Sequence, residues 1–366
     1  MAKMVHISGL RHIKVAGKEN LYCGWPWTGN IHNFGGGELA VIFTEADCAY
    51  RGPEDIEHYA LDCRGRQVLR RSLDHGESWP EALRVVIRDN AVPFQMLFPE
   101  GEAQREPIDM FRPESILCAW RSFSRDPWVT SDGKIRHKPI CFILRSADKG
   151  YTWEKVPIIV DPGPMDSIYG GSHYLKMPDG TLLAAFGGYK ESGESTPGRS
   201  ALYGSPDGGL TWYYVSTIGY EFEDITCHYP CLLALPDGRI MCSLGYRTRG
   251  GSWTSIVYSE DEGLSWSAPR RINRWGDQAY LLLLRDRRVV CLYGYRYKPY
   301  GIRGKVSDDL GETWSREFVV REDGGSPDLG YPVATELEDG RIFTAYYFNV
   351  ENGPRFIGGT FFNLEM

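Results

Sequence analysis

The sequence predicts an all-β fold: a six-bladed β-propeller with four-stranded antiparallel blades. Three observations predict it: an eight-residue motif that occurs five times, a second turn motif that recurs between its copies, and a composition rich in aromatic residues, glycine and proline. The copies of the first motif begin about 50 to 75 residues apart. Such spacing is typical of propeller blades with loops of varying length.

The first motif is Ser-x-Asp-x-Gly-x-(Ser/Thr)-Trp, and its copies begin at Ser72, Ser146, Ser205, Ser259 and Ser307. An aspartate at a turn accepts hydrogen bonds from nearby backbone amides, and glycine adopts a positive φ without steric cost. The tryptophan is expected to pack between neighbouring blades. The motif therefore assigns a structural role to its five carboxylates, those of Asp74, Asp148, Asp207, Asp261 and Asp309.

The second motif is an Asp-Gly turn between two β-rich runs, a strong hairpin signal. It occurs at Asp179, Asp237 and Asp339, and Asp286 occupies the same place without the glycine. Together the motifs place the blades near residues 30–90, 105–161, 166–218, 224–273, 275–321 and 328–366. The last blade lacks the first motif, so an N-terminal strand over residues 5–13 is expected to complete it and close the ring. Residues 1–366 are expected to form one domain.

Composition and charge argue against several classes of function. The net charge of −7 argues against non-specific nucleic-acid binding. No apolar run is long enough to span a bilayer, and no signal peptide is visible, so a cytoplasmic location is expected, or a secreted one if a leader has been removed. The nine cysteines include no CxxC pair, and the spacing of Cys227 and Cys231 is a weak zinc signal. We expect no cofactor or metal, and the oligomeric state stays open.

Cationic residues end the second strand of several blades. Counting ten or eleven residues past the turn aspartates reaches Lys190, Arg247 and Arg296, and Arg121 ends the matching strand of blade two. These strands end at one mouth of the tunnel, where converging cations favour an anionic ligand. Guanidinium groups match a carboxylate, so an acidic sugar is the expected ligand. The alternative is that they pair with acids on nearby loops, such as Glu191, Glu194 and Asp126.

Counting eight residues back from the same turns reaches Tyr229, Gln278 and Tyr331, near the start of the inner strands. His228 and Asp277 precede the first two, and a neutral histidine there is a candidate general base. Each tyrosine is as well explained by an aromatic tunnel wall as by chemistry. Asp328, in the segment that leads to Tyr331, is assigned with Tyr229 and Gln278 to substrate binding. In blade one, the acidic loop with Glu45 and Asp47 is expected to overhang the mouth and supply a proton donor.

The five-fold motif resembles the Asp-box, or BNR repeat, of the sialidase (neuraminidase) superfamily, and the resemblance extends over most of the chain. It implies that Tyr331 corresponds to the nucleophilic tyrosine and Asp47 to the acid/base aspartate. Arg247 and Arg303, with Arg296 as a competitor for the second, match arginines that hold the substrate carboxylate. The segment from Tyr293 to Pro332 also resembles bacterial sialidase-like hydrolases.

Two departures from the family pattern stand out. The Arg-Ile-Pro signature is absent, because the corresponding stretch from Cys23 to Asn30 contains no arginine. Where the glutamate partner of the nucleophile is expected, the chain has His228 and Tyr229. A phenol with an ordinary pKa of about 10 is a weak nucleophile without a carboxylate base.

The sequence therefore predicts an exo-acting glycoside hydrolase that releases a terminal acidic sugar, sialic acid-like or uronic, from a glycan. Its predicted catalytic residues are Tyr331, His228, Asp47 and Asp277. Two alternatives remain: a uronate lyase with tyrosine and histidine as acid and base, and a non-catalytic carbohydrate-binding propeller.

Overall fold

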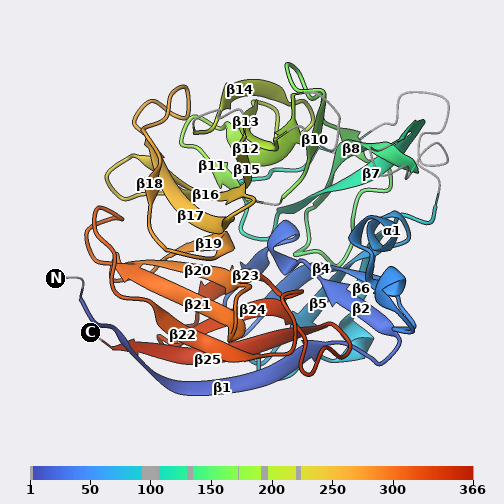
Figure 1. The fold of residues 1–366 in the computed structure, drawn as a ribbon. Helices are drawn as coiled ribbons and strands as arrows, with labels where there is room; N and C mark the ends of the chain where they lie inside the picture. The colour runs from blue at the N-terminus through green and yellow to red at the C-terminus, as the bar shows by residue number, and fades with distance from the viewer. Residues whose placement is uncertain are drawn as a thin grey trace.

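Six antiparallel sheets surround a central axis in the computed structural model of this chain (Figure 1). The structure describes residues 3–92, 105, 107–129, 135–171, 173–190, 197–219 and 224–365. The predicted six-bladed propeller is confirmed, and most blades have the predicted four-stranded antiparallel form.

The strands of the first three blades follow the chain in order. Blade one contains β2 (Leu21–Gly24), β3 (Ile31–Asn33), β4 (Leu39–Asp47), β5 (Arg66–Ser72) and β6 (Val85–Asp89). Blade two contains, in its described part, β7 (Ile116–Val129), β8 (Ile135–Ser146) and β9 (Ile158–Ile159). Blade three contains β10 (Ser167–Tyr169), β11 (Tyr174–Lys176), β12 (Leu182–Tyr189), β13 (Arg199–Ser205) and β14 (Tyr213–Thr217).

The other three blades are regular four-stranded sheets. Blade four contains β15 (Thr226–Ala234), β16 (Ile240–Thr248), β17 (Gly251–Ser259) and β18 (Arg270–Arg271). Blade five contains β19 (Asp277–Leu283), β20 (Val289–Tyr295), β21 (Tyr300–Ser307) and β22 (Phe318–Gly324). Blade six contains β23 (Gly330–Glu336), β24 (Ile342–Phe348), β25 (Phe356–Glu365) and the N-terminal β1 (His6–Ala16).

The ring closes as the sequence predicts. Strand β1 pairs antiparallel with β25, with His6 opposite Glu365 and Ala16 opposite Ile357. Figure 1 shows β1 along the outer edge of the molecule, with the two termini close together. The outer edge of blade six is thereby covered by a strand from the other end of the chain.

The five Asp-box turns share one hydrogen-bonding pattern. In the first, Asp74 accepts from the backbone N–H of Ser78 at 2.9 Å and from the Ser72 hydroxyl at 2.7 Å, while Gly76 N–H donates to Ser72. The residue before the glycine and the glycine itself both have positive φ in all five turns. Trp79 then stacks on Phe343 of blade six with ring centroids 5.7 Å apart, as expected for packing between blades.

Helical structure is sparse. The described residues contain one short α-helix, α1 (His58–Cys63), and three 3-10 helices: η1 (Pro26–Thr28), η2 (Pro53–Ile56) and η3 (Glu81–Leu83). Helix η1 interrupts the inner strand of blade one, and α1 lies in the loop that joins β4 to β5. Both breaks in the repeat pattern lie beside the axial pocket described below.

Candidate active site at the propeller axis

The inner strands of the blades are irregular at one level of the axis. The register shifts between His228 and Cys231 in β15, between Asp277 and Tyr280 in β19, and between Gly330 and Val333 in β23. The residue at each shift has a left-handed backbone: Tyr229 with φ 56°, Gln278 with φ 53° and Tyr331 with φ 53°. These are the residues reached by counting back from the hairpin turns. A bulge of this kind changes the direction in which a side chain points, and strained backbone of this type is common at functional sites.

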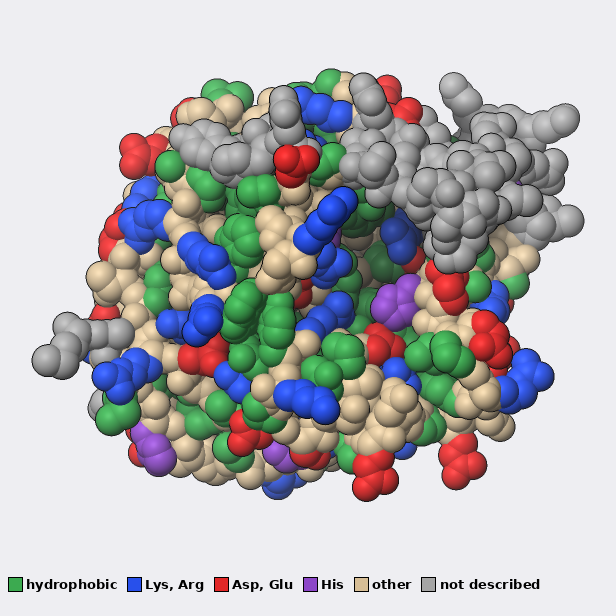
Figure 2. Space-filling view, viewed as in Figure 1, with side chains coloured by type: hydrophobic (Ala, Val, Ile, Leu, Met, Phe, Trp, Pro, Cys, Tyr) green, Lys and Arg blue, Asp and Glu red, His purple; other side chains and the backbone are tan. Residues whose placement is uncertain are grey.

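A pocket of about 320 Å³ opens at this level of the axis. Figure 2 shows a hollow near the centre of this face, with lysine and arginine side chains around it. The residues that line the pocket come from blades one, two, three, four and six and from α1: Trp25, Trp27, Thr28, His58, Trp120, Arg121, Tyr169, Gly170, Tyr189, Gly198, Thr226, His228, Tyr229, Arg247 and Tyr331.

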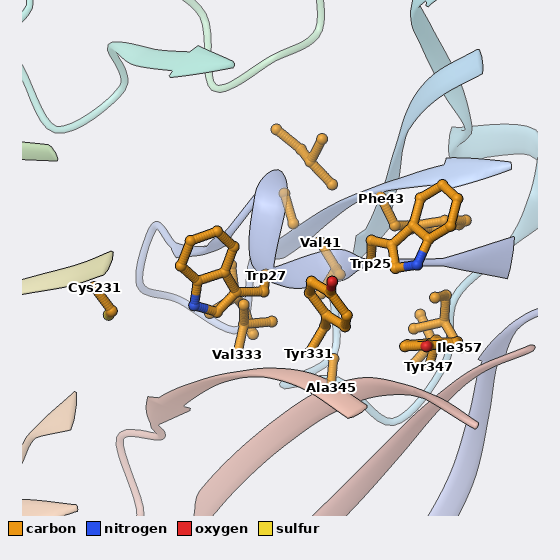
Figure 3. Packing of buried hydrophobic residues seen from close by; sticks show 14 of the residues in the cluster. Trp25, Trp27, Val41, Phe43, Cys231, Tyr331, Val333, Ala345, Tyr347 and Ile357 are labelled. Carbon is orange, nitrogen blue, oxygen red and sulfur yellow. The ribbon is translucent and has the colours of Figure 1, made fainter. Parts of the chain in front are cut away.

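Aromatic rings form much of the pocket wall. Tyr331 packs edge-on against Tyr229 with centroids 5.1 Å apart, and Trp27 lies 5.7 Å from Tyr229 and 6.4 Å from Tyr331. In Figure 3, Tyr331 lies between Trp27 and Trp25. Trp25 in turn stacks on Trp120 of blade two at 6.5 Å. Flat aromatic walls with a few polar groups are typical of small-ligand pockets.

Arg121 is held by a buried carboxylate. Its Nε donates to Asp62 Oδ2 at 2.8 Å, and its Nη2 contacts the same oxygen. Asp62 lies on α1 and is fully buried, and burial raises the pKa of this carboxyl although Arg121 opposes the shift. The guanidinium is thereby oriented at the pocket wall, against the rings of Trp120 and Tyr169.

Arg247 is held in the same way by a different blade. Its Nη2 donates to Oδ2 of the buried Asp277 at 2.8 Å, while 42% of its side chain remains exposed. Oδ1 of Asp277 and both polar ends of the neighbouring Gln278 amide have no hydrogen-bond partner among the described residues. Buried polar atoms without partners are uncommon and call for an explanation, such as a bound ligand or water. Asp277 and Gln278 thus lie directly behind the pocket-lining arginine.

Arg296 lies behind Tyr331 in the adjoining blade. Its Nε donates to the Leu329 carbonyl at 2.9 Å, and its Nη2 donates to the Tyr347 hydroxyl at 2.9 Å. The guanidinium also lies 5.6 Å from the centroid of the Tyr331 ring. It therefore adds positive charge at the floor of the site.

His228 and Tyr331 are both uncharged at neutral pH. Burial, with Arg247 and Arg296, lowers the pKa of His228 well below its usual value, and its Nε2 has no partner among the described residues. Burial, with neighbouring Tyr229, raises the pKa of Tyr331 well above that of a free phenol. His228 is thus a neutral base at the pocket, while Tyr331 is a protonated phenol.

Asp328 is the centre of a hydrogen-bonded network between blades one and six. Its carboxylate accepts from the Tyr347 hydroxyl at 2.9 Å, from Arg355 Nε at 2.8 Å and from Tyr22 at 3.2 Å. His58 Nε2 lies 3.0 Å from its Oδ1. Burial alone would raise the pKa of Asp328, but His58, Arg355 and Arg296 hold it well below the usual value, so the carboxylate stays ionised.

Asp277, Gln278, Arg296 and Asp328 lie behind the pocket-lining residues, and three further predicted residues lie away from the axial pocket. Asp47 is 79% exposed and pairs with Arg66 at 2.9 Å, on a separate cavity that Glu45 also lines. Arg303, in the third strand of blade five, donates to Glu317 at 2.6 Å and stacks on Tyr295. Lys190 is exposed just after β12 and does not line the pocket.

The alternative that the mouth cations pair with acids is therefore partly right, although with different acids. Arg121 pairs with Asp62 and Arg247 with Asp277. Glu191 and Glu194 and the side chain of Asp126 lie outside the described residues. Asp277 occupies one side of the Arg247 guanidinium, which leaves the other N–H groups of Arg247 for a ligand.

Sequence reasoning missed the contribution of blade one. Trp25, Trp27 and His58 all line the pocket, and none lies at a position that the repeats mark. The inner strand of this blade is split into β2 and β3, both paired with β4, and η1 fills the gap between them. The signal available was the Trp25-Pro26-Trp27 sequence at the place where a regular inner strand was expected.

Neither a metal-ligand cluster nor a membrane-spanning helix is found among the described residues. No cluster of three or more histidine, cysteine, aspartate or glutamate side chains there is arranged to hold a metal ion. None of the nine cysteines, all of which lie in the described residues, forms a disulfide, and the Sγ of Cys231 lies 3.5 Å from His173 Nδ1 in the core. None of the helices described is both long and apolar enough to cross a membrane.

A family model described as a BNR repeat-like domain matches residues 118–344. This chain belongs to that family. No functionally curated protein matches the chain.

Solved structures share the fold along nearly the whole chain. A Dyadobacter fermentans DSM 18053 protein of unknown function is 24% identical, with 98% of this chain and 100% of that chain covered and a TM-score of 0.77. Trypanosoma rangeli sialidase in complex with sialic acid is 12% identical, with 96% and 59% covered and a TM-score of 0.61. Penicillium chrysogenum α-L-arabinanase complexed with arabinobiose is 16% identical, with 97% and 98% covered and a TM-score of 0.59.

These likenesses establish the sialidase-like propeller fold. This BNR chain spans only 59% of the length of the Trypanosoma rangeli sialidase, and all three identities are low. Propellers carry many unrelated activities, so function has to be argued from the site itself.

Proposed function

We propose that this BNR propeller is an exo-acting glycoside hydrolase that releases a terminal acidic sugar from a glycan. The observation that carries the proposal is the pair of arginines, Arg121 and Arg247, in one aromatic pocket on the propeller axis. Distant structural likeness to sialidases and to an arabinanase supports glycosidic bonds as the class of bond attacked.

The charge of the pocket favours an anionic group. Burial lowers the pKa of His228, and the charges of Arg247 and Arg296 lower it further, so a ligand beside that ring lies near two cationic side chains. Because a guanidinium has five N–H donors in a fixed plane, one edge can bind the buried aspartate and another a ligand carboxylate. A sialic acid or uronic acid supplies that carboxylate.

The shape of the pocket favours one sugar unit. About 320 Å³ is near the lower end of the usual range for small-ligand sites. Trp25, Trp27 and Trp120 line the pocket and supply aromatic surface for contact with the C–H groups of a sugar. Entry of a single terminal residue corresponds to exo action.

The roles proposed for Tyr331 and His228 follow from the protonation state of each side chain. Tyr331, with its raised pKa, donates a hydrogen bond from its hydroxyl to a sugar oxygen at the floor of the pocket. His228, with its lowered pKa and a buried Nε2 that has no partner among the described residues, accepts a proton from a hydroxyl or a water molecule. Water attack at the anomeric carbon completes hydrolysis.

A uronate lyase is the second candidate, and one observation favours it. The described residues that line the axial pocket include no carboxylate side chain, whereas most glycosidases use two. In a lyase, the arginines would neutralise the uronate carboxylate, His228 would remove the C5 proton, and an acid would protonate the leaving oxygen.

The test is turnover of a panel of aryl glycosides and oligosaccharides that end in sialic acid, glucuronic acid or a neutral sugar, together with an oligosaccharide whose internal uronic acid carries a sugar on O4. That O4-linked sugar is the leaving group that a lyase needs. Wild type, Tyr331→Phe and the control Arg303→Gln are compared, and both released sugar and ultraviolet absorbance are recorded. We expect wild type and the control to release an acidic sugar, and kcat/KM to fall at least about 100-fold in Tyr331→Phe. New ultraviolet absorbance without addition of water would establish the lyase, and release of neutral sugars alone would contradict the proposal.

A further inference from the structure

The loop that joins β4 to β5 brings a histidine to the pocket that no repeat marks. His58 is the first residue of α1, and it lines the axial pocket with 47% of its side chain exposed. It packs edge-on against Trp25, with ring centroids 5.2 Å apart. Its ring is therefore fixed on one side by a pocket wall and open on another.

Asp328 fixes the orientation of this ring. His58 Nε2 lies 3.0 Å from Asp328 Oδ1 and 3.3 Å from the Tyr22 hydroxyl. Since an ionised carboxylate only accepts, Nε2 carries the hydrogen of this bond. Nδ1 forms no hydrogen bond with any described residue, so it is the nitrogen that remains to exchange a proton with a ligand.

Asp328 is itself rigidly placed. Arg355 is buried, and its Nε donates to Oδ2 of Asp328, while Tyr347 donates to Oδ1 and binds Arg296 through the same hydroxyl. The carboxylate is thus anchored in blade six while the imidazole that it holds belongs to blade one. A histidine oriented by a fixed carboxylate is a recurrent arrangement for proton transfer.

We propose that His58, oriented by Asp328, is the general acid that protonates the leaving-group oxygen of the glycoside. This inference rests on the proposed function, and it assigns to His58 the role that sequence resemblance gave to Asp47. Asp328 is then a positioning residue and not a substrate ligand, because the hydrogen bonds of its carboxylate go to His58, Tyr22, Tyr347 and Arg355.

His228 is a poor candidate for the same step. Burial and two arginines keep it neutral, and a neutral imidazole with a lowered pKa is suited to accept a proton and not to donate one. Asp47 lies on another cavity. Among the described histidines that line the axial pocket, His58 is the one with a carboxylate partner.

The overall reaction is the hydrolysis of one glycosidic bond by one water molecule. The proton of protonated His58 passes to the glycosidic oxygen while the bond between that oxygen and the anomeric carbon breaks, and the bonding electron pair stays on the oxygen. Water adds its oxygen to the anomeric carbon and gives one proton to His228. Proton exchange with solvent then returns His58 to its protonated form and His228 to its neutral form.

The test uses leaving groups that differ in their need for a proton. 4-Nitrophenyl glycosides of sialic acid and glucuronic acid are compared with sialyllactose and a disaccharide that ends in glucuronic acid, for wild type and His58→Gln. His6→Gln, which changes an exposed histidine at the start of β1, is the matched control. We expect His58→Gln to lose at least about 100-fold in kcat/KM on the unactivated sugars and less than about 10-fold on the 4-nitrophenyl glycosides.

Asp328→Asn should show the same dependence on the leaving group, with KM little changed, because it disturbs the orientation of His58 and not substrate binding. Equal losses on both leaving groups, or wild-type activity in His58→Gln, would overturn the general-acid role while leaving the proposed function intact. No turnover by wild type on any of the four compounds would instead overturn the proposed function, and this inference with it. Thermal unfolding of each variant checks that the fold is retained.

Discussion

Two groups of aspartates in this propeller have different structural roles. The five Asp-box aspartates lie at exposed turns, and each is satisfied by groups within its own eight-residue motif. Asp62, Asp277 and Asp328 lie behind the axial pocket, are largely buried, and pair with basic side chains from other strands or blades. The first group stabilises the turn that contains it, while the second holds basic side chains at the pocket.

The difference explains why the repeats predict the fold better than the site. The turn can be copied around the ring, because the hydrogen bonds of its aspartate are made within the motif. The pocket-side pairs occur once each and join elements that are distant in sequence, such as α1 with blade two. Variants of the two groups of aspartates and of their partners should therefore differ in how they affect activity and stability.

Arg247→Gln should give the largest effect. It removes a proposed ligand of the substrate carboxylate and leaves Asp277 buried without its partner. We expect kcat/KM on an acidic substrate to fall at least about 100-fold, and the free energy of unfolding to fall by about 3 kcal/mol. The double variant Arg247→Gln/Asp277→Asn should recover stability but not activity, in steady-state kinetics and chemical denaturation. Recovery of activity in the double variant would contradict the assignment.

Asp328→Asn should destabilise the fold in a pH-dependent way. The pKa of Asp328 is below its unfolded value of about 3.9, so its ionisation stabilises the folded state above that pH and this stabilisation is lost as pH falls. We expect a loss of about 3 kcal/mol at pH 7 and a smaller loss at pH 3, measured by urea unfolding. An equal loss at both pH values would show that the carboxylate charge is not the cause.

Asp207→Ala should affect stability alone. Asp207 accepts hydrogen bonds from the Thr211 backbone and hydroxyl and from Ser205 within one Asp-box. Losing them should cost about 1–2 kcal/mol in unfolding free energy, with kcat and KM unchanged on any substrate that wild type cleaves. A kinetic defect at the same temperature would mean that the turns and the pocket are not independent.

Arg303→Gln should have the smallest effect. Its ion pair with Glu317 lies in the third strand of blade five, outside the axial pocket. We expect a change of less than about 1 kcal/mol in stability and less than about 2-fold in kcat/KM. A large loss specific to acidic substrates would return Arg303 to the substrate-binding arginines that the family resemblance implies.

The sequence predicted the regular part of this site and missed the irregular part. Distances counted from the hairpin turns located Tyr229, Gln278 and Tyr331, because the inner strands of blades four, five and six meet the axis at the same distance from their turns. The same counting located Arg247, and Arg121 was located as the end of the matching strand in blade two. His58 and Asp62 were missed because they lie in a loop insertion, where no repeat fixes the distance to the axis. The buried partners of the arginines depend on contacts between blades, which sequence spacing does not report.

The most direct test of the account is the binding of free sugars, followed by tryptophan fluorescence, because Trp25, Trp27 and Trp120 line the pocket. Wild type and Arg247→Gln/Asp277→Asn are titrated with sialic acid, glucuronic acid and glucose. We expect at least one of the acids, but not glucose, to change the fluorescence of wild type, and this response to be weakened at least about 10-fold in the double variant. Equal responses to glucose and both acids, or acid binding that the double variant leaves unchanged, would contradict the claim that the arginines of the axial pocket recognise an acidic sugar.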